Sequence, residues 1–242
     1  MTRATHSSER ITGFVATDCA GTLDRMSPTV ADHARGVWTV VVAGGSGARF
    51  GGPKQFAMIG SRRVLDWAVD AARASSEGVV VVLPADRAAV EGGVVGGATR
   101  SESVRCGLRH VPAGAEVICV HDAARPFASV HLFAAVVNAV RAGADAAVPA
   151  LPVVDTIKQI GPDGRVVRTL DRATLVAVQT PQAFRADVLR RAHVGVPEGT
   201  DDAALVEATG GTVATVPGER VNRKLTEPED LEWARAAANS EV

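Results

Sequence analysis

A glycine-rich stretch with two cations carries the first chemistry in this sequence. The segment AGGSGARFGGPKQF spans Ala43 to Phe56 and contains Arg49 and Lys54. Glycine lets backbone N–H groups approach phosphate oxygens, because no side chain blocks the way. Arg49 offers a planar pair of donors, and Lys54 offers a mobile point charge. The pattern predicts a loop that binds a polyanion, with a glycine-rich surface turn as the alternative.

Two common phosphate loops do not match this stretch. A P-loop, G-x-x-x-x-G-K-[ST], could place its glycines at Gly47 and Gly52, but Pro53 then stands where lysine is required. A dinucleotide loop, G-x-G-x-x-G, could begin at Gly45, but Phe50 occupies its third glycine position. The remaining candidate is the longer loop of a nucleotidyltransferase, in which Arg and Lys follow the glycines.

A second polar cluster, HDAARPF, follows an apolar run and begins at His121. A carboxylate at the carboxyl end of a parallel strand faces the ligand crevice of an α/β sheet. Asp122 is therefore a candidate for holding Mg²⁺ together with phosphates. The alternatives for Asp122 are a turn cap or a pair with Arg125. For His121 we expect packing or hydrogen bonding rather than catalysis, because no nucleophile motif accompanies it.

The elements that must position these residues alternate along the chain. Apolar runs typical of strands buried on both faces occur at 37–43, 79–83, 116–120 and 145–151. Helical periodicity occurs between them, at 63–74, 99–111 and 129–143. The alternation predicts an α/β domain with a mostly parallel sheet flanked by helices and ligands at the carboxyl ends of the strands.

The later part of the chain predicts further elements of the same kind. They are a strand near 175–178, helices near 184–192 and 201–209, and a strand at 212–216. Two helix starts carry capping-box patterns: Thr99 with Glu102, and Thr226 with Glu229 at the start of a C-terminal helix.

Residues 152–174 interrupt the α/β alternation. They alternate in polarity on both sides of GPDG, a turn signal, and so predict a β-hairpin. A two-stranded ribbon is marginally stable by itself in water. We therefore expect this β-arm to pack on a partner subunit, in a homodimer.

Composition limits the remaining functions. The chain has 242 residues, 46% of them hydrophobic, and a formal net charge of −1, so no global field attracts nucleic acid or membrane. Its three cysteines show no zinc or disulfide spacing, which predicts a cytoplasmic protein. We expect residues 1–36 to be a disordered extension and residues 37–238 to be the functional domain.

Eight motifs along residues 37–238 together resemble one family. In chain order they are AGGSGARFGGPKQF, GGATRSESV, HDAARP, DTIK, DRATL, QTPQ, TDDA and RKLT. The set resembles the 2-C-methyl-D-erythritol 4-phosphate cytidylyltransferases of the non-mevalonate isoprenoid pathway. The resemblance implies a Rossmann-like, GT-A-like nucleotidyltransferase fold, transfer of CMP from CTP to methylerythritol phosphate with release of pyrophosphate, and a need for Mg²⁺.

The resemblance also implies catalytic and substrate-binding roles. Arg49 and Lys54 match the pair that stabilises charge on the α-phosphate in the transition state. Arg172 and Lys224 match the pair that positions the substrate phosphate. The resemblance further implies substrate contacts for Asp122, which is near the metal, and for Thr156 on the arm, with Thr156 and Arg172 serving the partner's site.

The nucleotide-binding positions are implied in the same way. Gly97 and Ser103 match cytosine contacts, and Ala98 stands where the family commonly has a carboxylate. The implied CTP-binding set is Ala43, Gly44, Gly45, Ser46, Gly47, Gly97, Ser103 and Ala123.

Two alternatives remain at this point. Ribitol-5-phosphate cytidylyltransferases share AGG, PKQF and TPQ, but HDAARP and DTIK favour the methylerythritol enzymes. A non-catalytic nucleotide-binding α/β module would bind CTP without releasing pyrophosphate. Arg49, Lys54 and Asp122 argue against such a module, since binding alone does not need all three.

Overall fold

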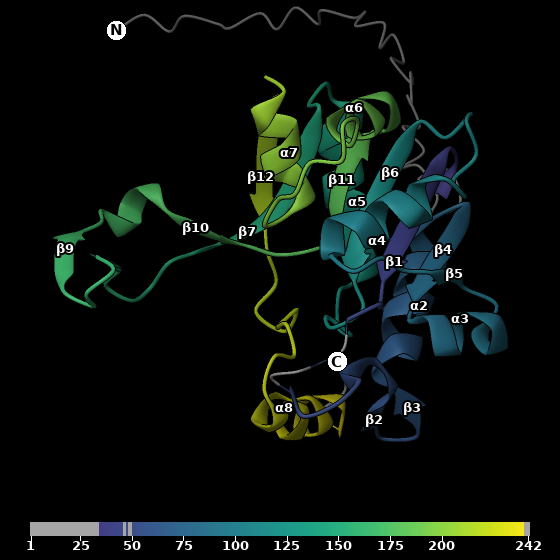
Figure 1. Ribbon diagram of the computed structural model, residues 1–242, viewed down its shortest axis with the longest axis horizontal. Helices are drawn as coiled ribbons and strands as arrows, with labels where there is room; N and C mark the ends of the chain where they lie inside the picture. The colour runs from purple at the N-terminus through teal and green to yellow at the C-terminus, as the bar shows by residue number, and fades with distance from the viewer. Residues whose placement is uncertain (1–33, 46, 48–49, 240–242) are drawn as a thin grey trace, which may run out of the picture.

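The computed structural model describes residues 34–45, 47 and 50–239 of the chain, and Figure 1 shows their arrangement. The predicted extension at residues 1–36 lies almost entirely outside the described residues. Within the described residues, every helix is too short or too polar to cross a membrane.

The described residues form an eight-stranded sheet in the order β10-β7-β11-β6-β1-β4-β5, with β12 also paired to β7. Its strands are β1 (Val37–Val42), β4 (Gly78–Leu83), β5 (Val94–Val95), β6 (Val117–Asp122), β7 (Ala146–Pro152), β10 (Val176–Val178), β11 (Gln182–Arg185) and β12 (Val213–Pro217). Parallel pairing joins β1 to both β4 and β6, β4 to β5, and β12 to β7. The predicted mostly parallel sheet is confirmed.

Strand β11 departs from the prediction. It runs antiparallel between β6 and β7, where the sequence predicted the start of a helix near residue 184. Helix α6 instead begins at Ala186. Phe184 is fully buried in the sheet, and its strand is too short to show a period in the sequence.

Helices cover both faces of the sheet. Helices α2 (Val64–Ser75), α3 (Ala85–Glu91) and α5 (Val130–Arg141) pack on one face. Helices α4 (Arg100–Leu108), α6 (Ala186–Ala192) and α7 (Asp202–Ala208) pack on the other. Each face buries valine, leucine and alanine side chains, so two apolar layers fix the strand ends that carry the polar loops.

The two predicted capping boxes are realised differently. The Thr99 hydroxyl accepts a hydrogen bond from the Glu102 amide, as expected, but the Glu102 carboxylate accepts from the Ala98 amide instead of closing the box. The box of Thr226 with Glu229 is wrong. Helix α8 (Pro228–Asn239) is capped by Asp230 in its first turn, whose carboxylate accepts from the Thr226 and Glu227 amides.

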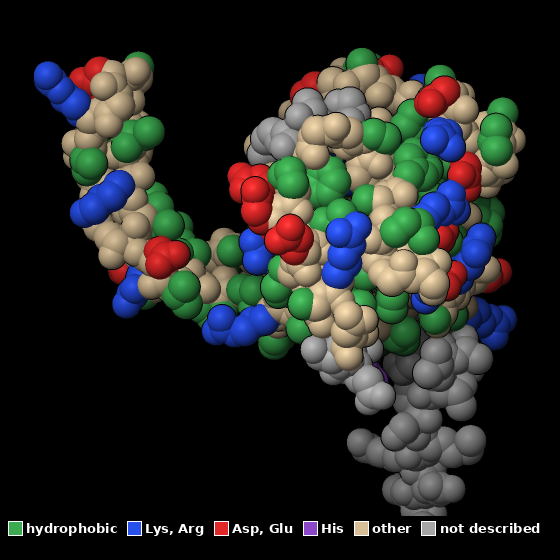
Figure 2. Space-filling model, turned by 90° about the horizontal axis from the view of Figure 1, so that it is seen from below, with side chains coloured by type: hydrophobic (Ala, Val, Ile, Leu, Met, Phe, Trp, Pro, Cys, Tyr) green, Lys and Arg blue, Asp and Glu red, His purple; other side chains and the backbone are tan. Residues whose placement is uncertain are grey.

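The predicted hairpin is confirmed as an arm that projects from the sheet (Figure 1). Strands β8 (Lys158–Ile160) and β9 (Val166–Thr169) pair antiparallel, and a short 3₁₀ helix, η3 (Arg172–Thr174), follows. Figure 2 shows the arm standing clear of the globular body with apolar side chains along it. The exposed apolar side chains of this arm are Val154, Ile160, Val166 and Val167.

A small cluster closes the lower end of the body, next to the glycine-rich loop. The 3₁₀ helix η2 (Lys54–Phe56) leads into the hairpin of β2 (Met58–Ile59) and β3 (Arg62–Arg63). Helix α8 packs here through Trp233, whose ring meets Phe127 edge to face, and Trp67 meets the same phenylalanine. This packing fixes the chain on either side of Lys54 and Lys224.

Candidate active site

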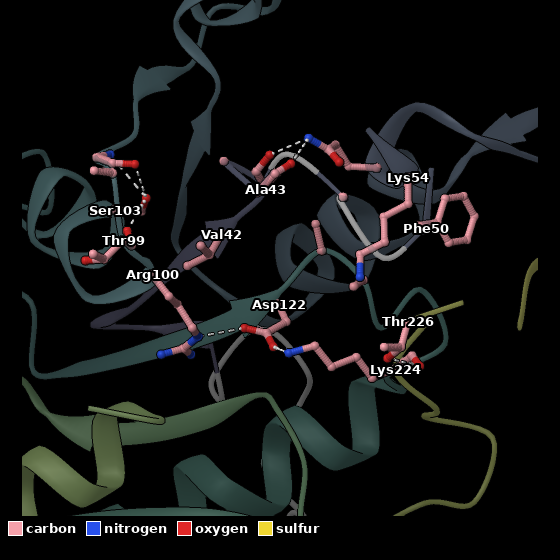
Figure 3. Close-up of a pocket in the computed structure, with 18 residues that line it drawn as sticks. Val42, Ala43, Phe50, Lys54, Thr99, Arg100, Ser103, Asp122, Lys224 and Thr226 are labelled. Atoms are coloured by element: carbon pink, nitrogen blue, oxygen red, sulfur yellow. Dashed lines mark hydrogen bonds and ion pairs between the residues drawn. The ribbon is translucent and has the colours of Figure 1, made fainter. Parts of the chain in front are cut away.

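A pocket of about 510 Å³ opens at the carboxyl ends of β1 and β6, bounded by the start of α4 and by the segment before α8 (Figure 3). This is the edge at which the sequence places ligands. The predicted site residues that line it are Ala43, Gly44, Gly45, Gly47, Lys54, Gly97, Ser103, Asp122, Ala123 and Lys224. Two further predicted residues, Ser46 and Arg49, lie outside the described residues.

The glycine-rich loop leaves β1 and turns tightly. Gly47 has a φ of +67°, and a Cβ there would lie 1.8 Å from the Gly52 carbonyl oxygen, so only glycine fits. The carbonyl of Gly47 accepts hydrogen bonds from the amides of Phe50 and Gly52. The loop is thus folded back on itself before Lys54.

Gln55 is a site residue that the sequence reasoning missed. Its buried amide donates to the carbonyl of Ala43 at 2.8 Å and to that of Gly45 at 3.1 Å. These two bonds hold the start of the glycine loop against η2. A glutamine beside lysine in a loop gives no signal in the sequence, because nothing there shows that its amide is buried.

The opposite wall belongs to the loop before α4. The Ser103 hydroxyl accepts from the Gly97 amide at 3.1 Å and donates to the Thr99 carbonyl at 2.9 Å. A Cβ on Gly97 would lie 2.1 Å from Cγ of Glu102, so this approach also requires glycine. The predicted pair of Gly97 and Ser103 is therefore joined directly and lies across the pocket from the glycine loop.

Asp122 ends β6 between two cations (Figure 3). Its Oδ1 lies 3.1 Å from Arg100 Nε, and its Oδ2 lies 2.7 Å from Lys224 Nζ. Burial by itself would raise the pKa of Asp122, but the charges of Arg100 and Lys224 outweigh burial and hold that pKa well below its ordinary value. Asp122 therefore remains ionised in the pocket.

The predicted alternative pair of Asp122 with Arg125 does not form. The Arg125 guanidinium donates to the carbonyls of Asn222 at 2.7 Å and Val178 at 3.3 Å. It thereby ties the end of β10 to the segment that carries Lys224. Arg125 thus supports the wall of the pocket from behind.

His121 has the supporting role expected of it. It is fully buried, and its Nε2 donates to the Arg125 carbonyl at 3.1 Å. Its Nδ1 accepts from the Thr180 hydroxyl at 3.1 Å, and that hydroxyl accepts from the Asp122 amide at 3.0 Å. Burial lowers the pKa of His121 to about 4, so the ring is neutral and this tautomer is fixed at neutral pH.

The two lysines of the pocket meet on one short segment. Lys54 Nζ donates to the Leu225 carbonyl at 2.6 Å, while the neighbouring residue, Lys224, reaches Asp122. The Leu225 amide donates to the Ala124 carbonyl at 2.8 Å, which docks the segment against the loop after β6. Both ammonium groups therefore face the same cavity, although the two lysines lie far apart in the sequence.

The structure does not bring the arm residues into this pocket. Thr156 and Arg172 are both exposed, and neither lines the cavity. Arg172 donates to the carbonyl of Val154 within its own arm. One copy of the described chain thus holds one part of the predicted site.

The pocket offers few carboxylates to a metal ion. The described residues contain no group of three or more His, Cys, Asp or Glu side chains that could hold a metal ion. Among the described residues that line the pocket, Asp122 is the single carboxylate. This donor set fits Mg²⁺ only if phosphates supply most of its ligands, which is a common arrangement for this ion.

Comparison with known proteins decides the family. The model of the IspD family, 2-C-methyl-D-erythritol 4-phosphate cytidylyltransferase, matches residues 37–240. The chain belongs to this family. A 2-C-methyl-D-erythritol 4-phosphate cytidylyltransferase of Nocardia farcinica is 43% identical over 218 residues, which cover 84% of this chain and 94% of that protein.

Solved structures of the cytidylyltransferase family share the fold. A cytidylyltransferase of this name from Thermus thermophilus superposes with a TM-score of 0.72 at 37% identity, covering 83% of this chain and 98% of that one. A 4-diphosphocytidyl-2C-methyl-D-erythritol synthase from Anaerococcus prevotii gives a TM-score of 0.73 at 29% identity, covering 84% and 98%. The resemblance inferred from the eight motifs is confirmed.

Proposed function

We propose that this protein is a nucleotidyltransferase that transfers CMP from CTP to 2-C-methyl-D-erythritol 4-phosphate. A phosphate oxygen of the polyol phosphate attacks the α-phosphorus of CTP, a new P–O bond forms, and the bond to the pyrophosphate leaving group breaks. The products are 4-diphosphocytidyl-2-C-methyl-D-erythritol and pyrophosphate. The observation that carries the proposal is the pocket in which Lys54 and Lys224 converge beside a glycine loop, in a chain of this family.

The shape of the pocket suggests how CTP lies in it. The glycine loop, Ala43 to Gly47, would hold the triphosphate through its backbone, and Ala123 lies beside it at the end of β6. The base would lie across the pocket, against Gly97 and Ser103. In this pose the α-phosphate would lie between the two lysines.

Catalysis in this site needs no protein nucleophile, because the substrate phosphate is itself the nucleophile. The difficulty is to bring two polyanions together, so positioning and charge neutralisation supply the rate. Lys54, with Arg49, would stabilise the charge that develops on the α-phosphate. Lys224, oriented by Asp122, would hold the incoming phosphate.

Mg²⁺ would be held mainly by the phosphates of CTP, with Asp122 as its protein carboxylate. When bound, the ion supplies positive charge to the triphosphate. Asp122 then has two tasks in the site, since it also orients Lys224.

The arm supports a homodimer. Val154, Ile160, Val166 and Val167 are each 59–64% exposed, which is unfavourable for a hairpin that stands in water unless another surface covers it. A second copy would cover this apolar face and receive Thr156 and Arg172 near its own pocket. Arg172 would then assist Lys224 of the partner chain in holding the substrate phosphate.

The cysteines and the family match support a proposal for the cellular compartment and for the domain boundary. Cys106 and Cys119 are unpaired, which supports a reducing compartment, and we propose the cytoplasm. We also propose that residues 1–36 lie outside the catalytic domain, because the family match begins at residue 37.

A turnover assay with purified protein, CTP and Mg²⁺ tests the proposal. Pyrophosphate release should depend on 2-C-methyl-D-erythritol 4-phosphate and be much slower with ribitol 5-phosphate. A preference for ribitol 5-phosphate would assign the chain to the related activity. CTP binding without pyrophosphate release from either acceptor would indicate a non-catalytic binding module.

A further inference from the structure

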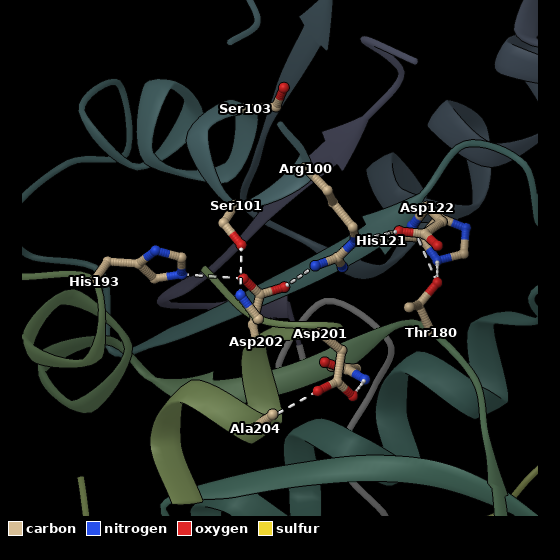
Figure 4. A network of polar contacts seen from close by, with 12 residues as sticks. Arg100, Ser101, Ser103, His121, Asp122, Thr180, His193, Asp201, Asp202 and Ala204 are labelled. Atoms are coloured by element: carbon tan, nitrogen blue, oxygen red, sulfur yellow. Dashed lines mark hydrogen bonds and ion pairs between the residues drawn. The ribbon is translucent and has the colours of Figure 1, made fainter. Parts of the chain in front are cut away.

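The two adjacent aspartates of the TDDA motif have different surroundings. Asp201 caps α7: its Oδ1 accepts from the Ala204 amide at 2.9 Å, and its Oδ2 accepts from Gln182 Nε2 at 2.7 Å. Asp202, the next residue, is fully buried and points the other way, toward Arg100 and His193 (Figure 4). The start of the helix is already capped by Asp201, so the burial of Asp202 needs another reason.

A buried carboxylate is costly unless other groups satisfy its charge. Both oxygens of Asp202 are engaged: Oδ2 lies 2.8 Å from Arg100 Nη1, and Oδ1 lies 3.0 Å from His193 Nε2. The His193 side chain is itself buried, and its Nδ1 has no hydrogen-bond partner among the described residues. The histidine side chain is thus directed at Asp202 alone.

Arg100 connects this buried pair to the pocket. Its guanidinium reaches Asp202 through Nη1 and Asp122 through Nε, and Asp122 in turn holds Lys224. The result is a continuous chain of ion pairs in which negative and positive groups alternate. It runs from the core to the cavity in the order Asp202–Arg100–Asp122–Lys224 (Figures 3 and 4). A planar guanidinium can bridge two carboxylates in a fixed geometry, whereas an ammonium group cannot.

We infer that Asp202 is a positioning residue for the transferase reaction, which acts on the reacting groups through Arg100 and Asp122. The inference rests on the proposed function. Asp202 holds Arg100 by a second carboxylate, so that a phosphate entering the pocket cannot draw Arg100 away from Asp122. Arg100 then shares the charge of Asp122. This leaves Lys224, whose side chain is 42% exposed and has one carboxylate partner among the described residues, as the cation that moves to the substrate.

The first test is Asp202→Asn, an isosteric change that removes the charge and leaves one oxygen that can still accept a hydrogen bond. Misplacement of a reacting group by about 1 Å can cost 100-fold in rate, so we expect kcat to fall by about 10- to 100-fold. The dissociation constant for CTP, measured by calorimetry, should change less than about threefold, because the nucleotide contacts the glycine loop and the loop before α4. A purely structural role would lower stability without separating kcat from CTP binding.

The decisive test is a double-mutant cycle with Arg100→Gln. If Asp202 acts through Arg100, Asp202→Asn should reduce kcat by less than about twofold in the Arg100→Gln background. Multiplicative losses would overturn the inference. Should Asp202→Asn fail to fold, Arg100→Lys addresses the same point: it should lose kcat with CTP affinity retained, because an ammonium group cannot bridge Asp122 and Asp202, and unchanged kcat would overturn the inference.

Asp145→Asn is the matched control. Like Asp202, Asp145 accepts hydrogen bonds and pairs with an arginine: it accepts from Thr212 and lies 3.5 Å from Arg185. It differs in its place, because it precedes the amino end of β7, away from the pocket at the carboxyl ends of the strands. Its turnover should equal that of the wild type. Wild-type protein without turnover would contradict the proposed function, and the inference would fall with it. If the wild type turns over and Asp202→Asn turns over equally fast, the inference is contradicted and the proposed function is not.

Discussion

The pocket and the arm carry parts of the same predicted site but are built in opposite ways. Asp122, at the pocket, has a side chain that is about 90% covered; its carboxylate pairs with Arg100 and Lys224, and its amide donates to the Thr180 hydroxyl. Arg172, on the arm, is exposed and bonds only to the backbone of its own hairpin in the described contacts. The pocket is held in place by the fold, whereas the arm stands clear of the globular body in the described residues (Figure 2).

This difference indicates which residues a single chain can orient. Lys54 and Lys224 are positioned by η2, by the loop after β6 and by α8, so their geometry exists before any partner binds. In the homodimer proposed above, the association of two copies would give Thr156 and Arg172 a defined position at a pocket. The comparison therefore separates a preformed half of the site from a half that assembly would complete in the proposed homodimer.

Removing a cation from the preformed half should have the largest effect. We expect Lys54→Ala to lower kcat by 100-fold or more, in line with about 3 kcal/mol for the loss of one well-placed transition-state donor. CTP affinity should change far less, since the glycine loop still binds the triphosphate. Single-turnover kinetics and calorimetry measure the two quantities, and a near-normal rate would remove the transition-state role of Lys54.

Mixing variants tests whether the two halves come from different chains. In an equal mixture of Lys54→Ala and Arg172→Ala proteins, half of the dimers are hybrids, and each hybrid has one intact site. Turnover should therefore recover to about a quarter of the wild-type rate. A mixture of Lys54→Ala with Lys224→Ala is the control, because every pocket then lacks one lysine and should stay inactive.

Absence of rescue has a clear meaning if subunit exchange is verified, for example by mass spectrometry of tagged chains. Each arm would then serve the pocket of its own chain, and the contrast between a preformed half and an assembled half would be wrong.

A smaller effect should appear in the pH dependence of the free energy of unfolding, because the buried His121 links the pocket to the core. Its pKa is lowered by burial to about 4, so between pH 6.5 and 4 the unfolded chain binds a proton that the folded chain does not. The contribution of His121 to the free energy of unfolding is therefore fully present above pH 6.5, and it is lost as the pH drops toward 4. The difference corresponds to about 3 kcal/mol, an upper value for a single group.

Urea unfolding at pH 7 and pH 4.5 measures this loss. The decrease between the two pH values should be smaller in His121→Gln than in the wild type, while the exposed His131→Gln should behave as the wild type does. Carboxylates whose pKa is lowered, such as Asp122, lose their contribution only below about pH 4, outside this window. Equal pH dependence in all three proteins would show that His121 is not the group involved.

The sequence predicts the main features of the fold because these features are periodic. The apolar runs at β1, β4, β6 and β7 and the helices between them show their burial directly in residue type. Strand β11 and the cap of α8 were missed for local reasons. The first is too short to show a period, and the second uses Asp230, which is one position later than the expected capping residue.

The candidate site was predictable where residue type alone indicates the chemistry and less so where a side chain bonds to another residue. Glycines, lysines and Asp122 carry their chemistry in their type and their place after a strand. Gln55, Arg100 and Asp202 act through hydrogen bonds to partners up to 102 positions away, and no local pattern reports such a pairing. Their roles follow only from the distances in the folded chain.

A crystal structure with CTP and Mg²⁺ tests the central claim most directly. The account predicts cytosine against Gly97 and Ser103, the triphosphate on the glycine loop, and Lys54 Nζ moved from the Leu225 carbonyl to an oxygen of the α-phosphate. A nucleotide bound elsewhere, or bound in the pocket with Lys54 and Lys224 both turned away from its phosphates, would contradict the account.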